Sequence, residues 1–144
     1  MADAFNKPSI THDLALRLVS EAARVAESKG KPFVIAIVDE SGLLKAFVRQ
    51  DGSRHISVQV AQDKAYTAVT GRPTHLWDET LVKDEVLGRG GHSAIARLVT
   101  LGGGYPVMVD GAIVGAIGVA GGHYSEDMEV ATEALGNLGL QNAW

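Results

Sequence analysis

The segment 102–122 constrains the fold most, because it is apolar, rich in glycine and interrupted by one tight turn. Asp110-Gly111 lies between two apolar runs, and such a dipeptide favours a two-residue hairpin in which both turn residues have positive φ. The resulting register places Val107 opposite Val114. Both surfaces of the hairpin are apolar, which predicts that it is covered on both faces and lies centrally in its sheet.

Glycines gather at the open end of this predicted hairpin. In this register Gly103 and Gly104 pair with residues near the end of the second strand, and Gly121 and Gly122 follow that strand directly. Glycine weakens a strand, so a cluster of this kind indicates a bulge, a sharp bend or the close approach of another group to the backbone. That group can be a packed helix or a bound ligand, and the sequence leaves both interpretations open.

Apolar periodicity in the rest of the chain predicts helices and one further hairpin. Helices are expected between Thr11 and Gly30 and over residues 57–70, 74–87 and 126–138, with strands over 33–38 and 43–49. The strand 43–49 has one mixed face, so it is expected nearer an edge of the sheet. Two hairpins separated by helices predict an α+β fold with helices packed on an antiparallel sheet, in a single domain over residues 1–144.

Composition argues against several classes of function. The 144 residues carry a net charge of −4 and no run of lysine or arginine, which argues against a nucleic-acid partner. Cysteine is absent from the sequence, which excludes thiolate nucleophiles, disulfides and cysteine-ligated metals. No stretch has membrane-spanning length and the first residues lack the pattern of a signal peptide, so we expect a cytoplasmic protein without a membrane partner.

His123 is the best placed of the five histidines for chemistry, because it follows the glycine end of the hairpin and precedes Glu126 and Asp127. An imidazole beside carboxylates can act as a base, a proton shuttle or a weak metal ligand. The alternative is that the two acids only complement the positive end of a helix that begins there, with Ser125 as its N-cap. The histidines show no established metal-binding spacing, so the sequence leaves any metal unknown.

Three further charged side chains are candidates for a site. Lys64 borders the stripe of small residues on the helix 57–70, where a lysine either extends to solvent or points into a pocket. Arg49 and Asp51 can pair across a turn, a contact that contributes little when it is exposed.

Several short motifs together resemble the GlcG/HbpS family, which includes the C-terminal domain of PduO. The resemblance spans nearly the whole chain, on residues 36–42 (AIVDESG), 49–52 (RQDG), 64–68 (KAYTA), 103–106 (GGYP), 115–122 (GAIGVAGG) and 126–127 (ED). The resemblance implies a five-stranded antiparallel sheet flanked by helices, close to the profilin/PAS-like layer, and a homo-oligomer.

The same resemblance implies haem as a possible cofactor, since members of the family include haem binders. His12, near the start of the first expected helix, is the nearest match to the axial histidine of the PduO-type domain. The resemblance assigns no role to His55, His92 or His123.

Three functions remain open from the sequence. The first is a small-ligand-binding protein that holds haem or a similar flat ligand, which requires an apolar groove and an axial donor. The second is an enzyme acting on a small carboxylate-bearing metabolite, in which Arg49 or Lys64 fixes the anion, His123 moves a proton beside Glu126, and glycine N–H groups stabilise an oxyanion. The third is a structural assembly module. The expected ligand-binding residues are Gly103, Gly104, Gly121, Gly122, Asp51 and His12.

Overall fold

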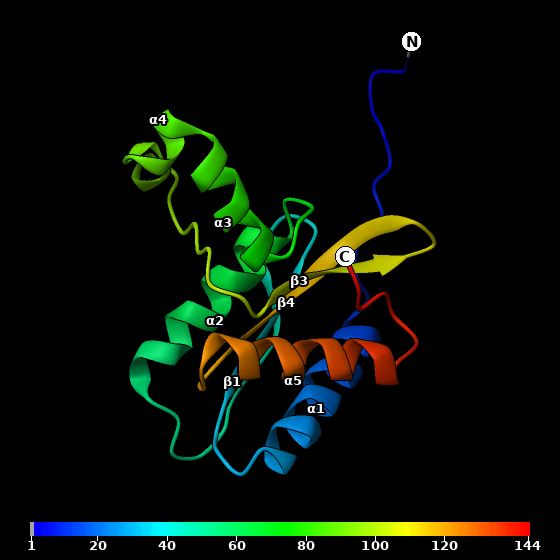
Figure 1. Cartoon of the computed structure of the whole chain (residues 1–144). Coiled ribbons are helices and arrows are strands. Elements are labelled where there is room, and N and C mark those ends of the chain that lie inside the picture. The colour runs from blue at the N-terminus through cyan, green and yellow to red at the C-terminus, as the bar shows by residue number, and fades with distance from the viewer. Residues whose placement is uncertain (1) are drawn as a thin grey trace.

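The computed structural model describes residues 2–144, in which one antiparallel sheet carries helices on both of its faces (Figure 1). The helices are α1 (His12–Ser28), α2 (His55–Ala68), α3 (Thr74–Lys83), α4 (Glu85–Gly88), the 3-10 helix η1 (Gly91–Ala94) and α5 (Tyr124–Asn137). The strands are β1 (Val34–Asp39), β2 (Leu44–Arg49), β3 (Gly104–Val109) and β4 (Ala112–Ala120). The predicted α+β class is confirmed.

The sheet within residues 2–144 has four strands in the order β2-β1-β4-β3, and all neighbouring pairs are antiparallel. The five strands implied by the resemblance are therefore wrong, because the chain between β2 and β3 forms only helices and loops. The central position expected for the glycine-rich hairpin holds for β4, whereas β3 lies at an edge. The edge position expected for β2 is confirmed.

Helices α1 and α5 cover one face of the sheet, and α2 covers the other. Side chains of β1 alternate between the two layers: Ile35 and Ile37 pack with α1 and α5, whereas Val34 and Ala36 pack against α2. All four are fully buried, which confirms the predicted buried strand. The segment from α3 to η1 extends away from the sheet as an arm (Figure 1).

The turn of the glycine-rich hairpin is formed as predicted, with φ of 50° at Asp110 and 77° at Gly111. The register further along the hairpin differs from the prediction. Val107 pairs with Gly115 and not with Val114, because the pairing shifts by one residue between Val107 and Met108. One extra residue in β4 forms this bulge, and strict alternation from the turn cannot anticipate it.

Small residues let α2 lie directly on the sheet. A Cβ atom at Gly118 in β4 would collide with the carbonyl oxygen of Ala61 and would lie 2.6 Å from the amide nitrogen of Ala65. The small side chains of this helix and the glycine at position 118 together permit this close approach.

Two helix predictions need correction. The single helix expected over 74–87 is split into α3 and α4, because Asp84 adopts an extended conformation and its side chain accepts a hydrogen bond from the amide of Leu87. The last helix begins at Tyr124, and its N-cap is His123 and not Ser125. Aromatic and imidazole residues are unusual at these positions, so the usual preferences point to the serine.

Candidate functional site

A pocket of about 300 Å³ lies where the first turns of α2 and α5 meet the end of β4, and we call it the Lys64 pocket. Five elements or loops contribute to it, so it exists only in the folded chain. Its lining residues are Arg54, Ile56, Ser57, Val60, Lys64, Leu101, Ala120, Gly121, Gly122, His123, Tyr124 and Asp127.

A buried ion pair forms the polar wall of this pocket. Lys64 Nζ lies 2.7 Å from Asp127 Oδ2 and donates a second hydrogen bond to the carbonyl oxygen of Val119 at 2.9 Å. The other carboxylate oxygen of Asp127 accepts a hydrogen bond from the amide of Gly122 at 3.0 Å. The side chains of Lys64 and Asp127 are only 2% and 4% exposed. The sequence predicts Lys64 at the border of the small-residue stripe on this helix, pointing either to solvent or into a pocket. In the structure its side chain points inward, to Asp127.

Burial shifts the titration of both members of the pair. Loss of hydration raises the pKa of the Asp127 carboxyl and lowers the pKa of the Lys64 ammonium, and each shift is opposed by the charge and hydrogen bond of the partner. Groups whose pKa values are shifted by burial in a cleft are candidates for function, although structural ion pairs show the same behaviour.

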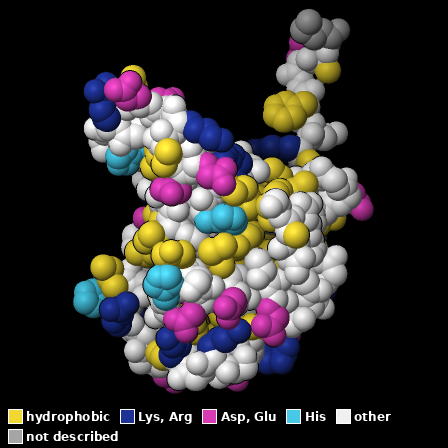
Figure 2. Space-filling model, viewed as in Figure 1, with side chains coloured by type: hydrophobic (Ala, Val, Ile, Leu, Met, Phe, Trp, Pro, Cys, Tyr) yellow, Lys and Arg dark blue, Asp and Glu magenta, His cyan; other side chains and the backbone are white. Residues whose placement is uncertain are grey.

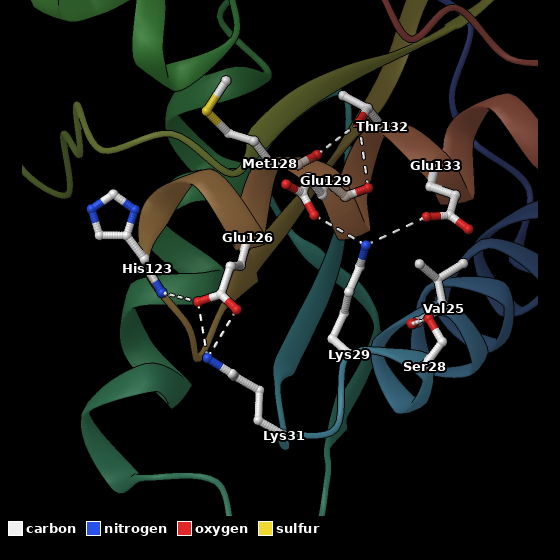
Figure 3. A network of polar contacts seen from close by, with 10 residues as sticks. All are labelled: Val25, Ser28, Lys29, Lys31, His123, Glu126, Met128, Glu129, Thr132 and Glu133. Atoms are coloured by element: carbon white, nitrogen blue, oxygen red, sulfur yellow. Dashed lines mark hydrogen bonds and ion pairs between the residues drawn. The ribbon is translucent and has the colours of Figure 1, made fainter.

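His123 and Glu126 form a reciprocal cap at the start of α5. Glu126 accepts a hydrogen bond from the amide of His123 at 3.0 Å and is paired with Lys31 at 2.9 Å (Figure 3). The hydrogen bond from Lys31, followed by that from the His123 amide, lowers the pKa of Glu126. His123 Nδ1 lies 2.8 Å from Ser125 Oγ. Glu126 is thus occupied by Lys31 and the cap, whereas His123 also lines the Lys64 pocket.

A second pocket of about 340 Å³ adjoins the first, because Leu101 and Tyr124 line both of them. We call the combined surface the Leu101–Tyr124 groove; the second pocket is completed by His75, Asp78, Thr100 and Gly102. Leu101 and Tyr124 are 55% and 48% exposed, so both side chains are accessible to a ligand where the two pockets meet. Figure 2 shows this face, with hydrophobic side chains between and around histidines.

His75 was not expected at a site from the sequence. Burial lowers the pKa of its imidazole, and its ring lies 5.8 Å from that of Tyr105, whose pKa burial raises to about 12. Its Nδ1 atom is buried and has no hydrogen-bond partner within residues 2–144. In the sequence, His75 is marked only by its position directly after the start of a helix. That position does not indicate that Gly102, in the segment leading to β3, lies beside it in the fold.

The hairpin glycines are packed against the protein's own atoms. A Cβ atom at Gly103 would lie 2.7 Å from the Val119 carbonyl oxygen, and one at Gly104 would collide with the Lys64 carbonyl oxygen. At Gly121 it would lie 2.7 Å from the Pro32 carbonyl oxygen, and at Gly122 2.8 Å from Glu126 Oε1. Packing against backbone atoms thus accounts for glycine at positions 103, 104 and 121, whereas the nearest atom to Gly122 is the end of the flexible Glu126 side chain. Gly121 and Gly122 also line the Lys64 pocket, and a ligand-binding role for the four remains a prediction.

The remaining candidates lie elsewhere. Arg49 and Asp51 line a separate, open pocket of about 550 Å³ beside Lys31. His12 lies on the surface at the start of α1, where its 78% exposed side chain contacts Asp13. The other end of this 17-residue helix leads to Lys31 and the α5 cap, so His12 is separated from the cap by about 25 Å of helix.

The part of the chain that the structure describes contains neither a cluster of metal-binding side chains nor a membrane-spanning helix. Residues 2–144 contain no group of three or more histidine and carboxylate side chains placed to hold a metal ion. No helix in that range is both long and apolar enough to cross a membrane.

Comparison with known proteins identifies relatives along most of the chain. The chain is 33% identical to Protein GlcG of Escherichia coli K12 over 114 residues, which cover 79% of this chain and 83% of GlcG. It is 31% identical to the corrinoid adenosyltransferase PduO of Salmonella typhimurium over 131 residues, which cover 90% of this chain. The match spans only 38% of PduO, so this chain corresponds to a part of that protein.

Solved structures give the same relationship. A crystal structure of HbpS has a TM-score of 0.85 at 30% identity and covers 94% of each chain. The crystal structure of a PduOC–haem complex has a TM-score of 0.84 at 27% identity, covering 94% of this chain and 99% of PduOC. Residues 10–136 match the family described as "Haem degrading protein HbpS-like". The chain belongs to the HbpS-like family, in agreement with the resemblance seen in its motifs.

Proposed function

We propose that this chain binds haem or a similarly flat ligand in the Leu101–Tyr124 groove. The observation that carries the proposal is the pair of adjoining pockets that share two exposed apolar side chains and hold one histidine each, His75 and His123. Flat cofactors bind in clefts with apolar walls and a few placed polar groups, and haem iron requires an axial donor. The HbpS-like family and the PduOC–haem complex support the same ligand class.

The residues of the groove fit such a ligand. Leu101 and Tyr124 offer an exposed apolar surface against which a flat ring can pack. His123 Nδ1 accepts a hydrogen bond from the Ser125 amide at 3.3 Å and lies 2.8 Å from Ser125 Oγ, so Nε2 is the ring nitrogen left to face a ligand. Binding of iron by Nε2 would require its proton to move to Nδ1, with loss of the cap bond from the amide. Burial lowers the pKa of the His75 imidazole on the other side of the groove, which favours its neutral form. Bound haem would supply a redox-active iron, which the side chains of the chain do not.

Haem titration followed by the Soret band tests the proposal. His123→Asn removes the imidazole but retains a residue that caps helices well, so its folding is expected to be preserved. We expect a changed Soret position and weaker binding in His123→Asn, and unchanged binding in His12→Ala on the exposed surface of α1. Loss of the Soret shift in His12→Ala, with normal binding by His123→Asn, would move the site to α1. No spectral change in the wild type would exclude haem binding.

The buried ion pair favours a second candidate, an enzyme acting on a small carboxylate-bearing metabolite. Lys64 and Asp127 have pKa values shifted by burial and line the same pocket as His123, which could move a proton. Native mass spectrometry of the purified chain tests this candidate. A bound small acid that is present in the wild type and absent from Lys64→Met would support it, and a ligand-free spectrum with no turnover of small acids would exclude it.

A further inference from the structure

The first turn of α2 lies open at the Lys64 pocket. Arg54, its N-cap residue, makes no side-chain cap hydrogen bond, and the first turn contains no acidic residue. Helix α1, in contrast, is capped by the Thr11 side chain and has Asp13 in its first turn. The first amides of a helix lack intrahelical partners and carry its partial positive charge, so an uncapped start of a 14-residue helix favours an anion.

Ser57 gives a second and independent indication of a ligand. It lies in this first turn, it is only 4% exposed, and it lines the Lys64 pocket. No hydrogen bond from residues 2–144 engages its hydroxyl group, and its oxygen is not one of the fully enclosed polar atoms without a partner, so the hydroxyl opens into the pocket. A ligand oxygen in the pocket would supply the missing partner.

The charges around the pocket favour a ligand group that carries a single negative charge. Each nearby acid has its own lysine: Asp127 is paired with Lys64 and Glu126 with Lys31. Arg54 makes no ion pair with the part of the chain that the structure describes, so its guanidinium remains for a ligand. A carboxylate matches a guanidinium, a hydroxyl donor and helix amides, whereas a phosphate dianion would meet stronger repulsion from the two acids.

We infer that Arg54, Ser57 and the first turn of α2 form a carboxylate-binding subsite that holds an acid group of the bound ligand. The carboxylate can belong to a haem propionate or to a free small acid, and both present the same chemistry to these donors. The haem case rests on the proposed function, while the free-acid case does not.

The first experiment compares haem with haem dimethyl ester, in which the carboxylates are masked. Loss of a charge-assisted hydrogen bond is expected to weaken haem binding about tenfold in Arg54→Gln, with a smaller loss in Ser57→Ala. Neither variant should change the affinity for the ester. Arg17→Gln on the exposed surface of α1 removes the same charge elsewhere and serves as the matched control. An equal loss for haem and its ester, or no loss in Arg54→Gln, would overturn the inference.

The second experiment separates the subsite from haem binding. Propanoate is titrated into the protein, and the amide shifts of residues 55–57 and 122 are followed by NMR, with inorganic phosphate in a parallel titration. Propanoate shifts in the wild type that disappear in Arg54→Gln would support the subsite, even where haem does not bind and the proposed function fails. Absence of propanoate shifts, or equal shifts with phosphate, would overturn the inference, even where haem binding persists.

Discussion

Replacing Lys64 by methionine tests how the buried ion pair contributes to stability. The change keeps the length of the side chain but leaves Asp127 charged, 4% exposed and without its 2.7 Å partner. Removing one member of a buried pair typically destabilises a protein by about 3–5 kcal/mol, because the remaining charge has lost its water and has no compensation. We expect a loss in this range for Lys64→Met, measured by urea unfolding followed by circular dichroism.

The double variant Lys64→Met/Asp127→Asn separates the charge from the packing. An asparagine at position 127 still offers an oxygen to the amide of Gly122 but carries no charge. We therefore expect the double variant to be more stable than Lys64→Met alone. If the single and double variants are equally destabilised, or if Lys64→Met costs less than about 1 kcal/mol, the ion pair does not act as argued.

The pH dependence of the same variant has a definite sign. Burial raises the native pKa of Asp127, and loss of Lys64 removes the charge and hydrogen bond that oppose this rise. In Lys64→Met the native state therefore binds a proton more tightly than the unfolded state, whose pKa is about 4. Stability then falls as the pH rises from the unfolded pKa through the native pKa. The deficit of Lys64→Met relative to the wild type should be smaller at acidic pH than at neutral pH.

Three substitutions test the packing and capping that shape the fold. Gly118→Ala should destabilise the chain by about 3 kcal/mol, because the added Cβ atom collides with the backbone of α2 at Ala61, and thermal unfolding measures this. Gly111→Ala is the matched control: its Cβ atom would meet nothing within 4 Å, so only the strain at φ 77° remains, about 1 kcal/mol. Equal losses in the two variants would contradict the packing argument. Thr11→Ala should cost about 1 kcal/mol through loss of the α1 cap, and no change in urea midpoint would count against that role.

Local sequence patterns predicted the elements of this fold well where a local interaction determines them. The turn at Asp110-Gly111 was predicted because only a few dipeptides adopt positive φ at both positions, and both residues do so here. The bulge that moves Val107 to Gly115 was missed. Both faces of the hairpin are apolar, so a shift of one residue changes the hydrophobic pattern little and leaves no trace in the sequence.

The site was less predictable, because its residues meet only through the tertiary fold. Periodicity placed Lys64 at the edge of a buried stripe, where extension to solvent is the usual outcome. Its burial depends on Asp127, which is 63 residues away in the sequence. His75 reaches the groove only because the chain after the arm returns past it at Leu101 and Gly102. The position of His123 beside the hairpin glycines predicts a role at a site, and in the structure His123 lines the Lys64 pocket.

The two interpretations of the hairpin glycines are not exclusive alternatives. Gly104 pairs with Gly118 across β3 and β4, and both face the backbone of α2, so the absence of side chains there seats the helix on the sheet. The same seating brings the carbonyl oxygen of Lys64 against Gly104 and its ammonium group against Gly103. A larger residue at position 104 would push this turn of α2 outward and lengthen the reach of Lys64 to Asp127. Glycine at the end of the hairpin is therefore a packing feature, and through that packing it is also what allows the charged wall of the pocket to form.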